Sequence, residues 1–224
     1  MTNDCTKLKK VLTGRPTRQD SQALHDHLLN IASVYFLEHG FQASSIEGIA
    51  KKAQVSKLTI YRQYQNKTNL FIAVIQAGVE QYIVDIRDWS RNKTVNAESL
   101  YELGMFISRR WFSLENIRLL RMTIPEVQRI QELSDMINAL MTQSRQPVEE
   151  FLAKLNQQKG YHIENIGTAT IQFIQLCVSG HYYLLRDESY LPSTDMLEEN
   201  VQNTVRLFLN GYQSRNESAL RGPV

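Results

Sequence analysis

The chain has 224 residues, enough for one or two domains with cores of their own. Hydrophobic residues make up 42% and charged residues 21%, which argues against a disordered, collagen-like or disulfide-stapled protein. The two cysteines, Cys5 and Cys177, have no spacing typical of a metal or redox site. The most apolar stretch, 171–185, is interrupted by polar residues, and no apolar run follows the N-terminal lysines. We therefore expect a soluble, cytoplasmic protein with no membrane partner.

The positive charge lies at one end of the sequence. Residues 1–67 carry ten Lys/Arg and five Asp/Glu, a balance of +5, whereas the remaining residues carry 15 and 18, a balance of −3. Such a distribution is expected if only the first third meets a polyanion, because phosphate neutralisation dominates affinity for nucleic acid. A solvated basic surface is the alternative interpretation.

The chain begins with a polar segment, 1–19, that contains Gly14 and Pro16 and shows no periodicity, so we expect a flexible basic arm. From Ser21 the apolar residues recur at helical intervals, which predicts an amphipathic helix that stops at Gly40.

The next segment has the layout of a helix-turn-helix. Ser44 and Glu47 have the spacing of a capping box, and the helix that they start should run to about Ala53. A tight turn then ends in a second N-cap at Ser56, and a short helix follows over 57–64.

The third helix should bury Val55, Ile60 and Tyr64. Its outward residues are Ser56, Lys57, Leu58, Thr59, Tyr61 and Arg62. This set mixes charges for phosphates with hydroxyl donors for phosphates and bases. An ordinary polar helix face is the alternative.

Helical periodicity continues to the end of the chain, with no alternating strand pattern. It predicts helices over about 66–88, 97–113, 115–129, 131–157, 164–186 and 194–213. Pro125 and Pro147 should kink or restart their helices. The last two helices have apolar faces that would suit a four-helix dimer interface or the core of a monomer.

Several spaced motifs lie between residues 14 and 75. They are Gly14-Arg15-Pro16, FLEHGF at 36–41, SIEGIAKKAQVSKLTIYRQY at 45–64, Asn66-Lys67 and Leu70-Phe71. In this region the chain resembles the N-terminal domain of the TetR family of transcriptional regulators. It departs from the family pattern at Gln54 in place of the usual turn glycine, at Tyr64 in place of phenylalanine and at Asn66 in place of a serine cap.

The resemblance implies an all-α fold, with an N-terminal three-helix helix-turn-helix head and a C-terminal helical bundle for ligand binding and dimerisation. The implied domains are the arm 1–19, the DNA-binding domain 20–66 and the ligand-binding and dimerisation domain 67–224. It also implies a transcriptional regulator rather than an enzyme, most commonly a repressor. Such a repressor binds a palindromic operator in double-stranded DNA as a homodimer, here through 164–186 and 194–213, and a small effector releases it. No cofactor or metal is expected; a protein-interaction module or an activator of the same fold is the alternative.

By the same resemblance, the DNA contacts fall on Ser45, Ser56, Lys57, Thr59, Tyr61, Arg62 and Lys67. We expect Lys57 and Thr59 to reach base edges, and Tyr61, Ser45 and Lys67 to hold phosphates. Arg15 and Arg18, in and after the Gly-Arg-Pro arm, are candidates for backbone or minor-groove contacts.

The C-terminal part holds 15 of the 20 aromatic residues, which suits a bundle cavity for a drug-sized apolar or aromatic ligand. Candidate ligand-binding residues are Tyr101, Phe106, Trp111, Met122, Phe151, Phe173 and Tyr182. Most of these side chains could instead be core. Four arginines at helical spacing, Arg109, Arg110, Arg118 and Arg121, could bind an anionic ligand or form surface ion pairs. No Gly-rich phosphate loop, nucleophile elbow or paired-carboxylate motif points to catalysis.

Overall fold

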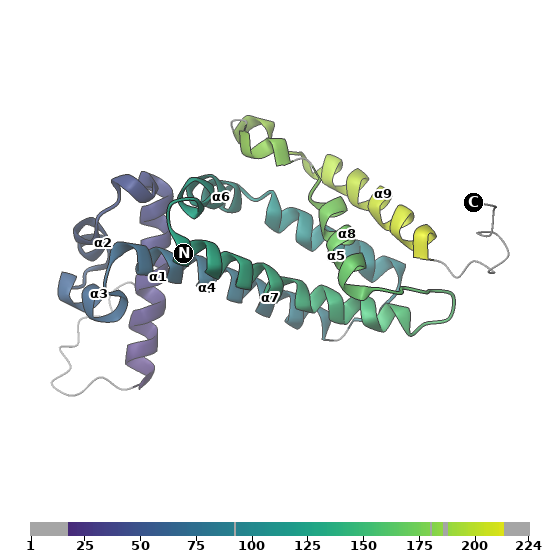
Figure 1. Cartoon of the computed structure of the whole chain (residues 1–224), viewed down its shortest axis with the longest axis horizontal. Coiled ribbons are helices and arrows are strands. Elements are labelled where there is room, and N and C mark those ends of the chain that lie inside the picture. Colours follow the sequence, from purple (N-terminus) through teal and green to yellow (C-terminus); the bar gives the residue numbers. More distant parts are fainter. Residues whose placement is uncertain (1–17, 92, 180, 186–187, 213–224) are drawn as a thin grey trace, which may run out of the picture. The chain divides into compact units, whose positions relative to one another are not determined.

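The computed structural model describes residues 18–91, 93–179, 181–185 and 188–212, and helices are the only regular elements within them (Figure 1). The predicted all-α class is confirmed. The chain divides into two compact units inside one helix, between Val74 and Ile75. We call the described residues 18–74 the head and those from 75 onward the second unit.

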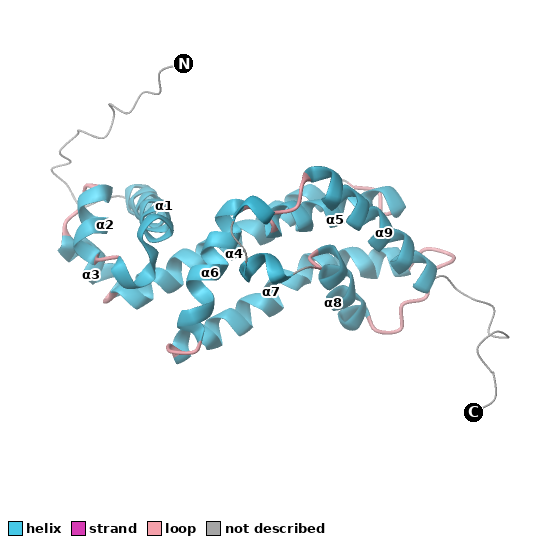
Figure 2. Ribbon diagram, turned by 90° about the horizontal axis from the view of Figure 1, so that it is seen from above, coloured by secondary structure: helices cyan, strands magenta, loops and turns pink. Residues whose placement is uncertain are grey.

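The head contains α1 (Arg18–Ala43), α2 (Ile46–Ala53), α3 (Lys57–Tyr64) and the start of α4 (Lys67–Ser90). The second unit contains the rest of α4, then α5 (Ala97–Trp111), α6 (Leu114–Val127), α7 (Gln131–Asn156), α8 (Ile166–Cys177) and α9 (Thr194–Tyr212). Two 3-10 turns, His181–Leu185 and Glu188–Tyr190, lie between α8 and α9. Figure 2 shows these elements from a second direction.

Three phenylalanines form the centre of the head. The ring of Phe71 lies 5.1 Å from that of Phe36 and 4.8 Å from that of Phe41, centroid to centroid. Gly40 adopts φ 76°, which interrupts the helical path of α1 just before Phe41. Because Phe71 and Val74 of α4 are buried in the head, the division by contacts falls about two turns beyond the predicted boundary at 66.

The start of α2 differs from the prediction by one residue. Ser45, not Ser44, is the N-cap, and its Oγ accepts a hydrogen bond of 3.0 Å from the Gly48 N–H. The Ser44 hydroxyl instead donates to the Gly40 carbonyl at 2.6 Å, because Ser44 is buried against the end of α1. Glu47 closes no capping box; its carboxylate pairs with Lys57 at 3.2 Å.

The turn between α2 and α3 ends at the predicted N-cap. Gln54, at the position where the TetR pattern has a turn glycine, occupies the left-handed region at φ 56°, and its N–H donates to the Ala50 and Lys51 carbonyls. Ser56 then caps α3 by accepting the Thr59 N–H at 3.0 Å, as predicted. The predicted third helix, 57–64, is confirmed.

The core of the second unit surrounds α5, which packs against α8 and α9. Leu103, Phe173 and Val201, one from each of these helices, are buried there. Gly104 permits the close approach, because a Cβ at this position would lie 2.6 Å from the Val201 Cγ1.

Helix α8 is shorter than the predicted helix over 164–186 and ends at Cys177. Its last carbonyls bind side chains from other helices: the Cys177 oxygen accepts from the Ser108 hydroxyl at 2.9 Å, and the Leu176 oxygen accepts from Asn200 at 3.0 Å. These bonds satisfy helix-end carbonyls that would otherwise need a further turn or water. Pro125 and Pro147 do not divide their helices: α6 runs to Val127 and α7 runs to Asn156.

Within the described ranges, α4 alone has the length and apolar composition of a membrane span, with a mean hydropathy of 1.2 over its most apolar window. Core helices of water-soluble proteins pass the same test. The apolar side chains of α4 serve two cores, since Leu70 and Phe71 are buried in the head and Ile83 and Ile86 are buried in the second unit.

Candidate nucleic-acid interface

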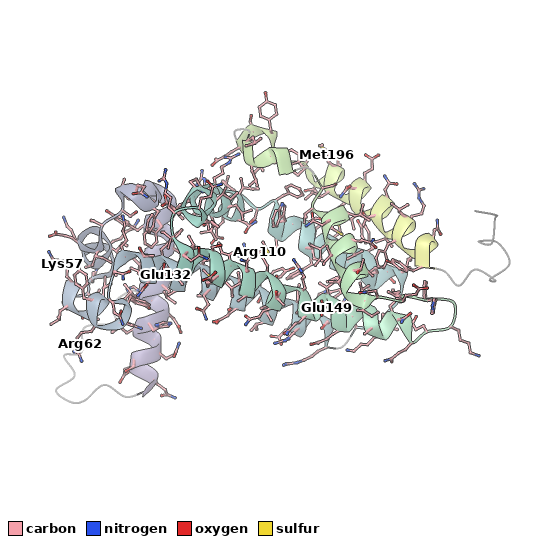
Figure 3. The ribbon with its side chains drawn as sticks, in the orientation of Figure 1. Lys57, Arg62, Arg110, Glu132, Glu149 and Met196 are labelled. Atoms are coloured by element: carbon pink, nitrogen blue, oxygen red, sulfur yellow. The ribbon has the colours of Figure 1, made fainter. Side chains whose placement is uncertain are left out.

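The outer face of α3 is a stripe of exposed basic, apolar and aromatic side chains. Leu58 is 67% exposed and Tyr61 is 48% exposed, and the charged ends of Lys57 and Arg62 also face outward (Figure 3). Ile60, on the opposite side of the helix, is fully buried in the head. This separation leaves one face of α3 free to contact a large partner.

Two predicted contact residues, Ser45 and Ser56, use their hydroxyl groups to cap helices. The Ser45 and Ser56 oxygens accept the cap hydrogen bonds of α2 and α3, and the hydroxyls of Ser56 and Thr59 lie 2.8 Å apart. Both serines are exposed and Thr59 is half-buried. Each cap keeps a helix N-terminus at the protein surface, where backbone N–H groups favour a phosphate.

The side chain of Lys67, which is predicted to hold a phosphate, binds carbonyl groups of the head. Its ammonium donates to the carbonyl oxygens of Phe41, Gln42 and Ser44 at 2.8, 3.2 and 3.0 Å, and it lies 4.5 Å from the centroid of the Phe41 ring. An ammonium has three N–H donors, and all three are engaged. The geometry therefore favours a structural role in which Lys67 ties the start of α4 to the end of α1.

The side of α3 opposite its exposed face contacts α1. The Tyr64 hydroxyl lies 2.9 Å from the His25 Nδ1, and the two rings are stacked with centroids 6.0 Å apart. Burial raises the pKa of Tyr64 to about 12, and the negative charge of Asp26 acts in the same direction. The phenol therefore stays protonated at neutral pH and above, and its contact with His25 joins α3 to α1.

The two arm candidates lie outside the described residues or at their first position. Arg15 lies outside the described residues, and Arg18 begins α1 but its side chain is not described. Leu58, by contrast, was named as outward-facing but was not among the predicted contacts. Its exposure, one helical turn from Tyr61 and Arg62, marks it as a candidate for apolar contact with a thymine methyl group.

The second unit has an open cavity of about 730 Å³ between α4, α5 and the starts of α6 and α9. Tyr101 and Phe106, two of the predicted ligand-binding residues, line it together with Trp89 and Met105. Its other lining residues are Asp85, Lys93, Glu102, Arg109, Arg110, Ser113, Glu115 and Glu198. This size lies in the usual range for drug-sized ligands.

The remaining predicted ligand residues lie elsewhere. Phe151 and Phe173 are buried in the core of the second unit, and Trp111 and Met122 are half-buried but do not line the cavity. The side chain of Tyr182 is outside the described residues.

The four arginines named in the sequence analysis also have different partners in the structure. Arg118 binds Glu188 through two hydrogen bonds of 2.5 and 2.8 Å, and Arg121 donates to two carbonyls of the first 3-10 turn. Arg109 and Arg110 line the cavity. Among the described residues, no group of three or more His, Cys, Asp or Glu could hold a metal ion.

Two family models match this chain. Residues 28–74 match the model for bacterial regulatory proteins of the tetR family, and residues 98–214, just over half of the chain, match the C-terminal domain of AefR-like transcriptional repressors. The chain belongs to the TetR family of transcriptional regulators. Members of this family are DNA-binding transcription factors rather than enzymes, bind small-molecule effectors and are typically dimers.

Individual relatives agree with this assignment. The transcriptional activator FasR of Mycolicibacterium smegmatis is 34% identical over 73 residues, which span 33% of each chain. A TetR-family regulator from Mesorhizobium loti superposes with a TM-score of 0.80 at 20% identity, covering 89% of this chain and 100% of that one. FadR from Bacillus subtilis, solved in complex with stearoyl-CoA, superposes with a TM-score of 0.62 at 18% identity over 84% of this chain and 98% of that one. At these identities the two structures show a shared fold.

Proposed function

We propose that this TetR-family regulator is a cytoplasmic repressor that binds a palindromic operator as a homodimer and is released by a small hydrophobic or aromatic effector. The observation that carries the proposal is the outer face of α3, where Lys57, Leu58, Tyr61 and Arg62 are exposed on a helix fixed from behind. A positioned helix with such a face suits the major groove. In this proposal Lys57, Leu58 and Thr59 read bases, whereas Ser45, Ser56, Tyr61 and Arg62 hold the backbone.

Dimerisation is assigned to α8 and α9. Ile171 on α8 is 41% exposed, and Met196 and Leu207 on α9 are 53% and 63% exposed. Large apolar side chains on adjacent helices are the expected constituents of a four-helix interface between two copies. The dimer would present two α3 helices to two half-sites.

Release is assigned to the cavity lined by Tyr101 and Phe106. A ligand that binds more tightly to a conformation with mismatched α3 helices would weaken operator binding by the same factor by which the operator weakens ligand binding. The repressor assignment is supported by the C-terminal family model, while the name of FasR makes activation the alternative outcome.

The interface is tested by measuring, at several salt concentrations, how tightly full-length variants bind a DNA duplex that the unaltered protein binds. Lys57→Ala and Tyr61→Ala should each weaken binding by roughly 5- to 150-fold, the range for a loss of about 1–3 kcal/mol. Lys159→Ala removes a charge of the same sign from an exposed loop of the second unit and is the matched control. Equal affinities for all four proteins would exclude α3 from the interface. A reporter gene then decides between repression and activation.

A further inference from the structure

Arg110 differs from the other charged groups that line the cavity of the second unit. Lys93 pairs with Glu102 at 2.6 Å, and Arg109 lies 3.8 Å from Glu198. Arg110, labelled in Figure 3, is a half-buried residue, and its guanidinium takes part in no ion pair or hydrogen bond within the described part of the chain. A cation partly removed from water without a partner is costly, and a bound anion would offset that cost.

Aromatic side chains line the same cavity as Arg110. Phe106 precedes it by one turn of α5 and lines the same cavity, and the ring centroid of Tyr82 lies 5.9 Å from that of Phe106. Burial raises the pKa of Tyr82 above its usual range, whereas the charge of Arg110 acts in the opposite direction. The charge of Arg110 therefore acts on a phenol that stays protonated at neutral pH.

The acidic groups of the cavity, unlike Arg110, are either exposed to solvent or have partners within the protein. Asp85 is exposed and accepts a hydrogen bond of 2.7 Å from Gln81. Glu115 is exposed in the first turn of α6, where the helix N-terminus stabilises a carboxylate. The wall therefore carries satisfied or solvated acids and one half-buried cation that lacks a partner.

We propose that this cavity binds an apolar or aromatic monoanion, whose anionic group pairs with Arg110 while its apolar body lies against Phe106, Tyr101 and Trp89. The inference rests on the proposed function, because it names the chemical class of the effector that this function requires. An Arg guanidinium suits a carboxylate particularly well, since it offers two parallel N–H donors.

Calorimetric titration of the full-length protein with matched probes tests the inference. One series is decanoate, decanamide and decylamine; the other is 2-naphthoate, 2-naphthamide and 2-naphthylmethylamine. At least one carboxylate should bind, and its amide should bind roughly ten- to a hundredfold more weakly, because the charge-assisted pair is lost. The amines should bind more weakly still.

Substitutions test whether Arg110 is the cation that binds the carboxylate. Arg110→Gln should weaken carboxylate binding roughly ten- to a hundredfold, and Arg110→Lys should restore part of it. Arg91→Gln, which removes an exposed cation of the same unit that does not line the cavity, should leave binding within about twofold and is the matched control. Thermal unfolding of each variant shows whether the fold is retained.

Equal binding of amide and carboxylate, preference for an amine, or no binding of either carboxylate at millimolar concentration would overturn the inference. So would an unchanged affinity in a folded Arg110→Gln protein. Operator binding is measured separately: Arg110→Gln should bind DNA as the unaltered protein does. If a carboxylate binds through Arg110 but does not release DNA, the monoanion site stands and the proposed release mechanism fails.

Discussion

Replacement of Lys67 by methionine distinguishes a structural role from a DNA contact. The substitution removes the ammonium, and with it the hydrogen bonds to the carbonyls of Phe41, Gln42 and Ser44, but keeps a stem of similar length. A hydrogen bond to a charged group is worth about 1.5–3 kcal/mol. Because one ammonium makes all three bonds and the partly exposed carbonyls regain water, we expect the head to lose about 2–3 kcal/mol rather than the sum of three bonds.

Amide hydrogen exchange of the DNA-free protein measures this loss locally. A decrease of about 2–3 kcal/mol should accelerate exchange of protected head amides that open with the unit by roughly 30- to 150-fold. Lys51→Met is the matched control, because the side chain of Lys51 is exposed on α2 and forms no hydrogen bond or ion pair within the described head. It should change stability by less than about 0.5 kcal/mol.

The salt dependence of DNA binding completes the test. A lysine that neutralises a phosphate contributes about one unit to the slope of log K against log salt, so a structural Lys67 should leave that slope unchanged on substitution. Unaltered exchange together with a slope reduced by about one would refute the structural role and restore the predicted phosphate contact.

Three further substitutions test the packing and the buried titratable groups. Gly104→Ala should destabilise the second unit by about 1–3 kcal/mol, because the added methyl group would overpack the contact with α9. Gly78→Ala, which has no atom within 4 Å of the added methyl, should stabilise the same unit by up to about 1 kcal/mol. Urea unfolding that gives both changes in stability the same sign would contradict the packing at α9. Because the pKa of Tyr64 is raised to about 12, the stability that its protonated phenol contributes is fully present below pH 10. That contribution should be lost from about pH 10 to about pH 12. Tyr64→Phe should make the decline of unfolding free energy over this pH range shallower. Burial raises the pKa of the Cys177 thiol to about 12, so in a Cys5→Ser protein this thiol should react with a disulfide reagent only as fast as the second unit opens; rapid labelling of the native protein would show that it is accessible.

The sequence predicted the elements whose signals are local. Helix α3 has its predicted bounds because Ser56 caps its start and Ile60 and Tyr64 repeat at the spacing of one buried face. Gln54, which stands where the family pattern has a turn glycine, occupies the left-handed region. Adjacent Ser44 and Ser45 could not be separated in this way, because the choice depends on how the chain leaves α1 at Gly40.

The rest depended on partners distant in the sequence. Helix α8 ends where Ser108 and Asn200, from other helices, bind its last carbonyls. The arginines looked equivalent in the sequence, yet Arg118 finds Glu188 seventy residues away and Arg110 finds no carboxylate within the described residues. Lys67 has the residue type and position of a phosphate ligand, and only the folded head shows its three carbonyl partners.

The central claim, that a dimer reads DNA through the outer face of α3, is tested most directly by selecting bound sequences from a random duplex pool with the purified full-length protein. We predict enrichment of a palindrome whose half-sites are centred one helical turn, about 34 Å, or a multiple of it apart. A Lys57→Ala, Tyr61→Ala double variant should lose that enrichment while Lys159→Ala keeps it. No enrichment at low salt, or a motif that the double variant selects equally well, would contradict the claim.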